Sequence, residues 1–227
     1  MSGAGADAGD VVSRLQMERL VAEGELVGRS VVGVVARSAG LASADLDGVS
    51  LTRVDLREAD GDDARVERSQ WLQVDARQSR WRGALWNRVQ ARDCDLTEID
   101  LAGAHLLRCD LGPLRMARAS LVGARIHSTV FREAELYGAD FRGAVVIRST
   151  FEGYGGSATV SLSRTDWTGA TLVEVDFRRA SLYGAVLAGA RLLRCDLRGV
   201  NLCAGDLRGA HLVGCAVDGL DLDGATL

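Results

Sequence analysis

Bulky apolar residues recur along this chain with a period of five, most clearly between residues 95 and 141. Two residues before each of them, at position i−2, stands a small or apolar residue, and the residue between, at position i−1, is usually polar. The bulky residues themselves, at position i, are Leu96, Leu101, Leu106, Leu111, Met116, Leu121, Ile126, Phe131, Leu136 and Phe141. A period of five matches neither the helical turn nor the alternation of a simple strand, so the pattern predicts an internal repeat.

The repeat has a geometric interpretation. If positions i and i−2 both point inward, the other three residues of each unit must face solvent, which is possible where each unit forms one side of a square coil. Four units then complete a coil, and successive coils stack about 4.8 Å apart through strand-type pairing. The bulky residues fill the axis of such a rod, and the small residues leave room for them near the corners.

Individual units resemble the A-(D/N)-L-x-x pattern of pentapeptide-repeat proteins; examples are Cys94-Asp95-Leu96-Thr97-Glu98, Ala139-Asp140-Phe141-Arg142-Gly143 and Cys195-Asp196-Leu197-Arg198-Gly199. The resemblance covers nearly all of the chain after residue 24. It implies an all-β protein folded as a right-handed quadrilateral β-helix. We therefore expect a single elongated solenoid.

The repeat and what precedes it divide the chain into three segments. Residues 1–9 are small and Gly/Ala-rich, and we expect them to be disordered. Residues 10–24 predict a short α-helix, with Asp10 as its N-cap and Gly24 just after its last turn, that covers the open first coil. Residues 25–227 predict the β-helix, which is interrupted near residues 152–160.

The repeat loses phase once, because Phe151 and Leu162 are eleven residues apart instead of ten. Three glycines between them indicate either a one-residue bulge or a six-residue projecting loop. The residues of this candidate loop are Gly153, Tyr154, Gly155 and Gly156.

Carboxylates recur at position i−1 of every fourth unit, on one side of the expected rod. This predicted acidic column, our candidate partner-binding surface, consists of Asp55, Asp75, Asp95, Glu135, Asp176 and Asp196. A one-residue bulge keeps Asp176 and Asp196 on this side, whereas a six-residue loop replaces them with a series that begins at Ser161. We prefer the one-residue bulge because it keeps the column acidic. Aspartate is also the ordinary choice of the family at position i−1, and arginines such as Arg57 and Arg77 stand beside the column.

Three tryptophans, Trp71, Trp81 and Trp86, fall at position i, where the neighbouring units have Gly or Ala. Volume compensation inside the coil explains this combination, since a void and an overpacked core are both costly. The alternative is an outward patch that binds a partner. We favour the core.

The composition narrows the class of function. The net charge of −4 is mild but excludes a strongly basic protein that binds nucleic acid directly, and no apolar stretch is long enough to cross a membrane. With no signal-peptide pattern at the N-terminus, we expect a cytoplasmic protein. Four of the five cysteines fall at position i−2, and no motif for a catalytic nucleophile, a phosphate or a metal is present. We therefore expect a non-enzymatic protein without a cofactor.

The resemblance implies that the partner is another protein. Some pentapeptide-repeat proteins bind DNA gyrase and related topoisomerases, imitate duplex DNA and protect the enzyme from antibiotics. The expected rod and the acidic column favour this role. The alternative is a scaffold or accessory protein of a larger assembly, because residues 20–28 are similar to the start of pentapeptide-repeat proteins linked to bacterial type VI secretion. The repeat also continues to Leu227, which makes a homodimer through the uncapped C-terminal coil a candidate assembly.

Overall fold

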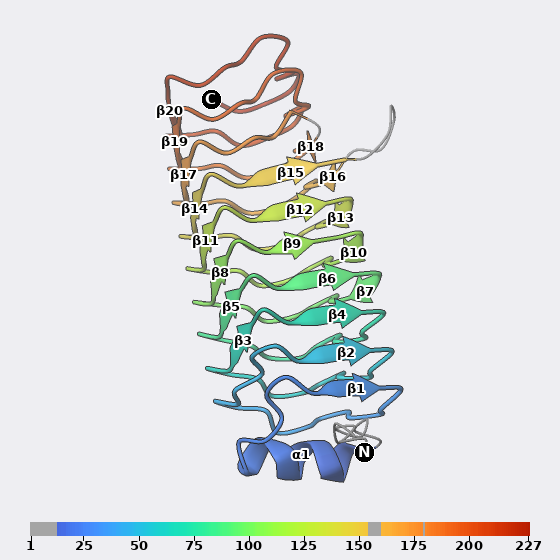
Figure 1. Cartoon of the computed structure of the whole chain (residues 1–227). Coiled ribbons are helices and arrows are strands. Elements are labelled where there is room, and N and C mark those ends of the chain that lie inside the picture. The colour runs from blue at the N-terminus through green and yellow to red at the C-terminus, as the bar shows by residue number, and fades with distance from the viewer. Residues whose placement is uncertain (1–12, 154–159, 179) are drawn as a thin grey trace, which may run out of the picture.

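The computed structural model describes residues 13–153, 160–178 and 180–227 and shows a solenoid of about nine turns (Figure 1). All its strands pair in parallel, and on either side of the interruption paired residues lie twenty positions apart, as Val31 does from Leu51 and Leu51 from Trp71. Four five-residue units therefore make one coil. The predicted quadrilateral β-helix is confirmed.

Three sides of the rod are sheets of very short strands. The seven-stranded sheet contains β1 (Ser30–Val32), β2 (Ser50–Thr52), β4 (Gln70–Leu72), β6 (Gln90–Arg92), β9 (Asp110–Leu111), β12 (Val130–Arg132) and β15 (Thr150–Glu152). The five-stranded sheet contains β7 (Cys94–Asp95), β10 (Leu114–Arg115), β13 (Ala134–Glu135), β16 (Val160–Ser161) and β18 (Ala180–Ser181). The eight-stranded sheet contains β3 (Arg65–Glu67), β5 (Leu85–Asn87), β8 (His105–Leu107), β11 (Arg125–His127), β14 (Val145–Ile147), β17 (Thr171–Val173), β19 (Arg191–Leu193) and β20 (His211–Val213).

The remaining side, between the five-stranded and the eight-stranded sheets, is held by single β-bridges such as Asp60↔Arg80. We call it the bridge side. Chain reversal at the corners needs a left-handed residue at position i+2. At Leu101–Ala104 this residue is Gly103, with φ 68°, and the Ala104 N–H donates to the Leu101 carbonyl at 3.0 Å. Arg108 adopts the same conformation, with φ 54°. A residue with a side chain takes up this left-handed conformation at a higher energetic cost than glycine.

The axis of the rod is packed with aromatic rings. Trp71, Trp81 and Trp86 are all buried, with ring centroids 4.8 to 5.9 Å apart, so the core interpretation of the tryptophans is correct and the surface interpretation is wrong. Further along, Phe131, Phe151 and Phe177 stack on successive coils at 4.8 and 5.2 Å. This continuous core makes the rod rigid.

The interruption is a six-residue insertion, and the predicted one-residue bulge is wrong. Glu135 pairs with Ser161, twenty-six residues along the chain instead of twenty, and Thr150 pairs with Asp176 in the same way. The reason lies in the core. A one-residue bulge would require another complete side between Phe151 and Leu162, but Gly156 and Ser157 offer no bulky side chain to fill it. Of the candidate loop, Gly153 is buried at the end of β15, and Tyr154, Gly155 and Gly156 lie outside the described residues.

The N-terminal helix α1 (Arg14–Ala22) lies across the first coil (Figure 1). It is shorter than the predicted helix over residues 10–24: its N-cap is Ser13, which accepts from the Gln16 N–H, and Asp10 lies outside the described residues. Gly24 ends it as predicted, with φ 70° and its N–H donating to the Val21 carbonyl. Within the part of the chain that the structure describes, no helix is long and apolar enough to cross a membrane.

The helix is fitted to the first coil by both apolar and polar contacts. Met17 and Leu20 are buried against the core. On the polar side, Arg14 donates to the carbonyls of Arg37 and Ser38, and the Gly40 N–H donates to the Glu18 carboxylate at 3.2 Å. These are backbone groups at the open edge of the solenoid. The helix is therefore a cap in the sense that it satisfies this edge.

Candidate protein-interaction surfaces

Part of the predicted acidic column exists as a stack on the five-stranded side of the rod. Asp55 pairs with Asp75 and Asp75 with Asp95, and beyond Arg115 the stack continues to Glu135. Successive residues of this stack come from successive coils, so they lie about 4.8 Å apart along the axis.

Arginines neutralise most of this stack. Arg57 forms a bidentate ion pair with Asp55 and also reaches Asp75 at 3.4 Å. The pattern repeats one coil further on, where Arg77 binds Asp75 at 2.7 Å and approaches Asp95 at 3.7 Å. Arg115 then binds Asp95 from the other side at 2.9 Å. We call this set the ion-pair ladder; its residues are Asp55, Arg57, Asp75, Arg77, Asp95 and Arg115. Its charges alternate, so it is not a bare row of carboxylates.

The aspartates of the ladder also have a structural role. The Asp55 carboxylate accepts a hydrogen bond from the backbone N–H of Arg57, two residues on, and Asp75 accepts one from Arg77. The hydrogen bonds from Arg57 hold the pKa of Asp55 below its ordinary value. Burial acts to raise the pKa of Asp75, but the Arg77 hydrogen bonds outweigh it and the pKa is lowered. Aspartate at position i−1 thus fastens the following corner, which explains its frequency without any partner.

Asp176 and Asp196 do not belong to this stack, and their assignment to the acidic column is wrong. The six-residue insertion moves them to the seven-stranded side, where Asp176 pairs with Thr150 and Asp196 with Asp176. Arg178 binds Asp176 at 2.7 Å, and Arg198 binds Asp196 at 2.6 Å. The five-stranded side continues instead with Ser161, Ser181, Asn201 and Asp221.

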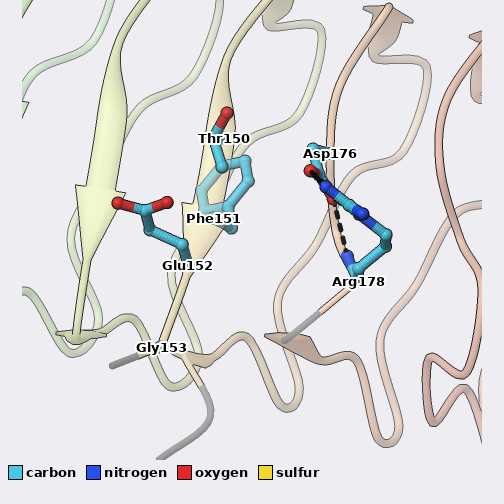
Figure 2. Close-up of a pocket in the computed structure, with 6 residues that line it drawn as sticks. All are labelled: Thr150, Phe151, Glu152, Gly153, Asp176 and Arg178. Atoms are coloured by element: carbon cyan, nitrogen blue, oxygen red, sulfur yellow. Dashed lines mark hydrogen bonds and ion pairs between the residues drawn. The ribbon is translucent and has the colours of Figure 1, made fainter. Parts of the chain in front are cut away.

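Figure 2 shows where Asp176 lies. With Arg178 it lines a hollow of about 280 Å³ next to Thr150, Phe151, Glu152 and Gly153, at the point where the insertion leaves β15. Asp176 and Gly153, which belong to separate candidate sites in the sequence, thus line the same hollow. Glu152 is already paired with Arg132 at 2.9 Å. The charged groups at this hollow balance one another, so it has little net charge of its own.

A second acidic surface was found only in part from the sequence, since Glu135 belongs to the predicted acidic column but its neighbours Asp93 and Glu133 do not. Asp93 and Glu133 are exposed corner residues on either side of Pro113, and Glu135 is exposed beside them. Over the described residues, none of these three carboxylates has an arginine within ion-pair distance, although Arg115 lines the same hollow of about 400 Å³. We call the set of Asp93, Pro113, Glu133 and Glu135 the Pro113 corner. Reasoning that followed position i−1 alone could not find it, because Asp93 and Glu133 stand at position i+2.

Three of the five thiols are enclosed in the core. Cys94, Cys109 and Cys195 are buried, and burial raises the pKa of each thiol to about 11, so they are protonated at neutral pH. Within the described residues, no group of three or more His, Cys, Asp or Glu side chains is placed to hold a metal ion.

The fold defines a class: a parallel β-solenoid with four-sided coils and a packed axis. The family model for pentapeptide repeats matches residues 115–153, 160–192 and 190–227, with eight copies. The chain therefore belongs to the pentapeptide-repeat proteins.

The solved structure of a quinolone-resistance protein agrees with this fold. The chain is similar to a trypsin-treated variant of QnrB1, a plasmid-mediated fluoroquinolone resistance protein, with 19% sequence identity, a TM-score of 0.57, and coverage of 87% of this chain and 90% of that chain. It also matches HetL, a pentapeptide repeat protein involved in heterocyst differentiation regulation in the cyanobacterium Nostoc, with 21% identity, a TM-score of 0.32, and coverage of 95% and 97%. No curated protein matches the chain.

Proposed function

We propose that this protein is a non-catalytic, protein-binding β-helix whose partner is a bacterial type II topoisomerase such as DNA gyrase. The observation that carries the proposal is the Pro113 corner, where three carboxylates without arginine partners project from a rigid rod. Unpaired carboxylates on a rigid frame attract the basic groove that normally holds DNA phosphates. The fold shared with the quinolone-resistance protein QnrB1 is consistent with this role. The proposal also places the protein in the cytoplasm, where gyrase acts.

The carboxylates that we expect to contact the topoisomerase differ from the predicted acidic column. The ion-pair ladder is unsuited to DNA mimicry, since each of its aspartates is bonded to an arginine that opposes its field. Reversing Asp75 or Asp95 would also break hydrogen bonds within the rod. Asp93, Glu133 and Glu135 are exposed and make no such bonds among the described residues, so their reversal should leave the fold intact.

The test compares two triple variants in gyrase binding and supercoiling. In the first, Asp93, Glu133 and Glu135 are replaced by Lys. In the control, the exposed carboxylates Asp63, Asp218 and Asp223, which form no ion pair in the part of the chain described, are replaced by Lys. Both variants change the net charge equally, so only the position of the charges differs.

We expect the first variant to lose gyrase binding and the control to keep it. Binding by the unmodified protein should weaken as salt rises, because the attraction is screened over about 10 Å at 0.1 M. Equal loss in both variants would show that net charge alone matters and would remove the Pro113 corner from the proposal. An absence of gyrase binding at low salt would exclude the gyrase proposal and favour the scaffold of a larger assembly, such as type VI secretion.

The homodimer remains a prediction. The last coil exposes apolar side chains, among them Leu212, Val213 and Val217. Analytical ultracentrifugation of the purified protein tests it: a monomer across the micromolar range would contradict the prediction.

A further inference from the structure

The outward surface of the eight-stranded sheet is strongly basic, although the chain as a whole has a net charge of −4. The strands of this sheet and the residue directly after each strand carry eight arginines and only two glutamates. They are Arg65, Arg68, Arg88, Arg108, Arg125, Arg148, Arg191 and Arg194, with Glu67 and Glu174. We call this surface the basic sheet face. It lies two sides away from the five-stranded sheet, on the opposite side of the rod (Figure 1).

Half of these arginines have no carboxylate partner among the residues that the structure describes. Glu174 neutralises part of the charge of Arg148 and Arg194, at 2.9 and 2.7 Å. Elsewhere among the described residues, only Arg53 and Arg164 lack a carboxylate within ion-pair distance. The unpaired arginines of the basic sheet face are Arg88, Arg108, Arg125 and Arg191. Uncompensated positive charge is therefore concentrated on this one sheet, where it favours an acidic partner.

An apolar stripe runs along the middle of the same face. Ile147, Val173, Leu193 and Val213 stand at position i+1 of β14, β17, β19 and β20, and each pairs with the next in the ladder. These side chains point outward and are only partly covered, and Val213 is 59% exposed. A hollow of about 540 Å³ opens beside Val173, Leu193 and Val213, with Arg191 at its edge.

Arginines stand on both flanks of this stripe. On one flank lies Arg191, the first residue of β19, which has no carboxylate partner among the described residues. On the other flank Arg148 and Arg194 directly follow β14 and β19, and they share the single carboxylate of Glu174. The other unpaired arginines of the face lie on the neighbouring coils of β5, β8 and β11, beyond the end of the stripe. A matching occupant therefore needs an apolar strip with carboxylates on both sides. Duplex nucleic acid is a poor match, because its phosphate backbone has nothing to cover the apolar stripe.

The spacing of the stripe distinguishes a helix from a strand. Successive coils lie about 4.8 Å apart, so four stripe residues span about 14 Å. A helix laid along the axis of the rod places an apolar residue about every 5.4 Å and spans about 16 Å over the same number of contacts. A strand repeats the same face only about every 6.6 Å, for about 20 Å. The helix follows the stripe more closely. The strands of the sheet are already paired within the rod, so recognition must use side chains.

We propose that the basic sheet face is a second protein-binding surface, which takes an amphipathic α-helix with an apolar strip and acidic flanks from a partner protein. The apolar strip covers Ile147, Val173 and Leu193. The carboxylates on its flanks pair with Arg191 on one side and with Arg148 and Arg194 on the other. This surface is separate from the Pro113 corner, so it allows the rod to hold two proteins at once.

The experiment measures binding of a designed helical peptide, with Leu on one face and Glu on both flanks, to the purified full-length protein. In one variant Arg191, beside the stripe, is replaced by Glu; in the matched control Arg53, which directly follows β2 on another side of the rod, is replaced by Glu. Both arginines are exposed and lack a carboxylate partner in the described chain, so the two variants change the net charge equally and differ in location. A third variant, Leu193→Ser, reduces the apolar stripe.

We expect the first variant to weaken peptide binding by on the order of tenfold, the control to stay within about twofold, and Leu193→Ser to weaken binding as well. A version of the peptide with Lys in place of Glu should not bind. Equal binding of the Lys and Glu peptides, or equal loss in the two arginine variants, would overturn the proposal. So would binding of vesicles containing phosphatidylserine, or of duplex DNA, at lower concentration than the acidic peptide. Loss of gyrase binding is not a readout here, so the two proposals fail independently.

Discussion

Gly61 and Trp81 occupy successive coils on the bridge side of the rod, and the indole of Trp81 lies where a side chain at Gly61 would be. A methyl group on Gly61 would come within 2.3 Å of the Trp81 Cε3 atom. Trp81 is fully buried, and its indole N–H donates to the Ser79 hydroxyl at 2.9 Å, which fixes the ring in place. The missing side chain on one coil thus makes room for the large side chain on the next.

Replacing Gly61 with Ala should therefore destabilise the protein by overpacking. We expect a loss of about 1–3 kcal/mol in the free energy of unfolding, measured by urea denaturation. Gly40→Ala is the matched control, because a side chain at Gly40 has no neighbour within 4 Å and the substitution should be nearly neutral.

A double variant identifies the cause. Trp81→Phe alone creates a void and removes the hydrogen bond to Ser79, so it also destabilises. If Gly61→Ala acts through the indole, the double variant should be less destabilised than the sum of the two single variants. Strict additivity would show that the cost of Gly61→Ala has another origin.

The core was predictable because it depends only on the period of the sequence. Position i defines the axis, and the pairing of tryptophans with Gly or Ala at that position indicated compensation in volume; Gly61 and Trp81 show it in the structure. The hydrogen-bond and ion-pair partners of the polar side chains were less predictable. Whether Asp55 is free or bonded depends on where the Arg57 side chain turns, and Arg57 reaches both Asp55 and Asp75. A one-dimensional pattern does not contain that choice.

The insertion offers a second test. Gly153 ends one unit and Val160 begins the next, so deleting residues 154–159 restores the twenty-residue spacing. We expect the deletion variant to keep its circular dichroism spectrum and a melting temperature close to that of the full chain. Deleting residues 121–126, which are equally many but lie within a regular coil, should shift inward residues outward and lower the melting temperature strongly. Similar melting temperatures for the two deletions would contradict the assigned register.

The error over this insertion is instructive in physical terms. The choice between one and six residues was made on the continuity of carboxylates at the surface, where aspartate recurs on every side of the rod. The axis imposes a stricter condition, because a side without a bulky residue leaves a void unless a large side chain on a neighbouring coil fills it, as Trp81 does at Gly61. Residues 152–160 have only Gly156 or Ser157 at the required position. Filling of the core should have outweighed the surface pattern.

The N-terminal helix should contribute to solubility more than its length suggests. Deleting residues 1–23 uncovers the first coil and leaves the Gly40 N–H without its acceptor, the Glu18 carboxylate. We expect the shortened protein to aggregate, by the general argument on open strand edges, and to melt at lower temperature. Light scattering and thermal denaturation measure both effects.

A pair of point variants on the helix provides the control. Glu18→Ala removes the acceptor for Gly40 and should lower the melting temperature. Arg19→Ala removes only an exposed, long ion pair with Glu23 at 3.9 Å and should have little effect. A deletion variant that stays soluble with an unchanged melting temperature would show that the helix does not protect the first coil.

Acid should destabilise the protein through the aspartates that are bonded to an arginine two residues on. Hydrogen bonds from Arg208 lower the pKa of Asp206 from 3.8 to about 2, and those from Arg57 and Arg198 lower the pKa values of Asp55 and Asp196. Because these pKa values are lower in the folded state, the ionised aspartates stabilise the folded state fully at any pH above their ordinary value. That stability is lost as pH falls from near 4 through the folded pKa values. Melting temperatures between about pH 2 and pH 7 measure this loss.

Replacing Asp55, Asp196 and Asp206 with Asn isolates these groups. Asparagine keeps an oxygen that can accept the backbone N–H two residues on, but it removes the charge that pairs with arginine. The triple variant should melt lower than the unmodified protein at pH 7, and the difference should shrink toward pH 2, where the aspartates become protonated. The control replaces Asp63, Asp218 and Asp223 with Asn and should follow the unmodified protein at every pH. A difference that stays constant with pH would mean that the substitutions act through packing and not through charge.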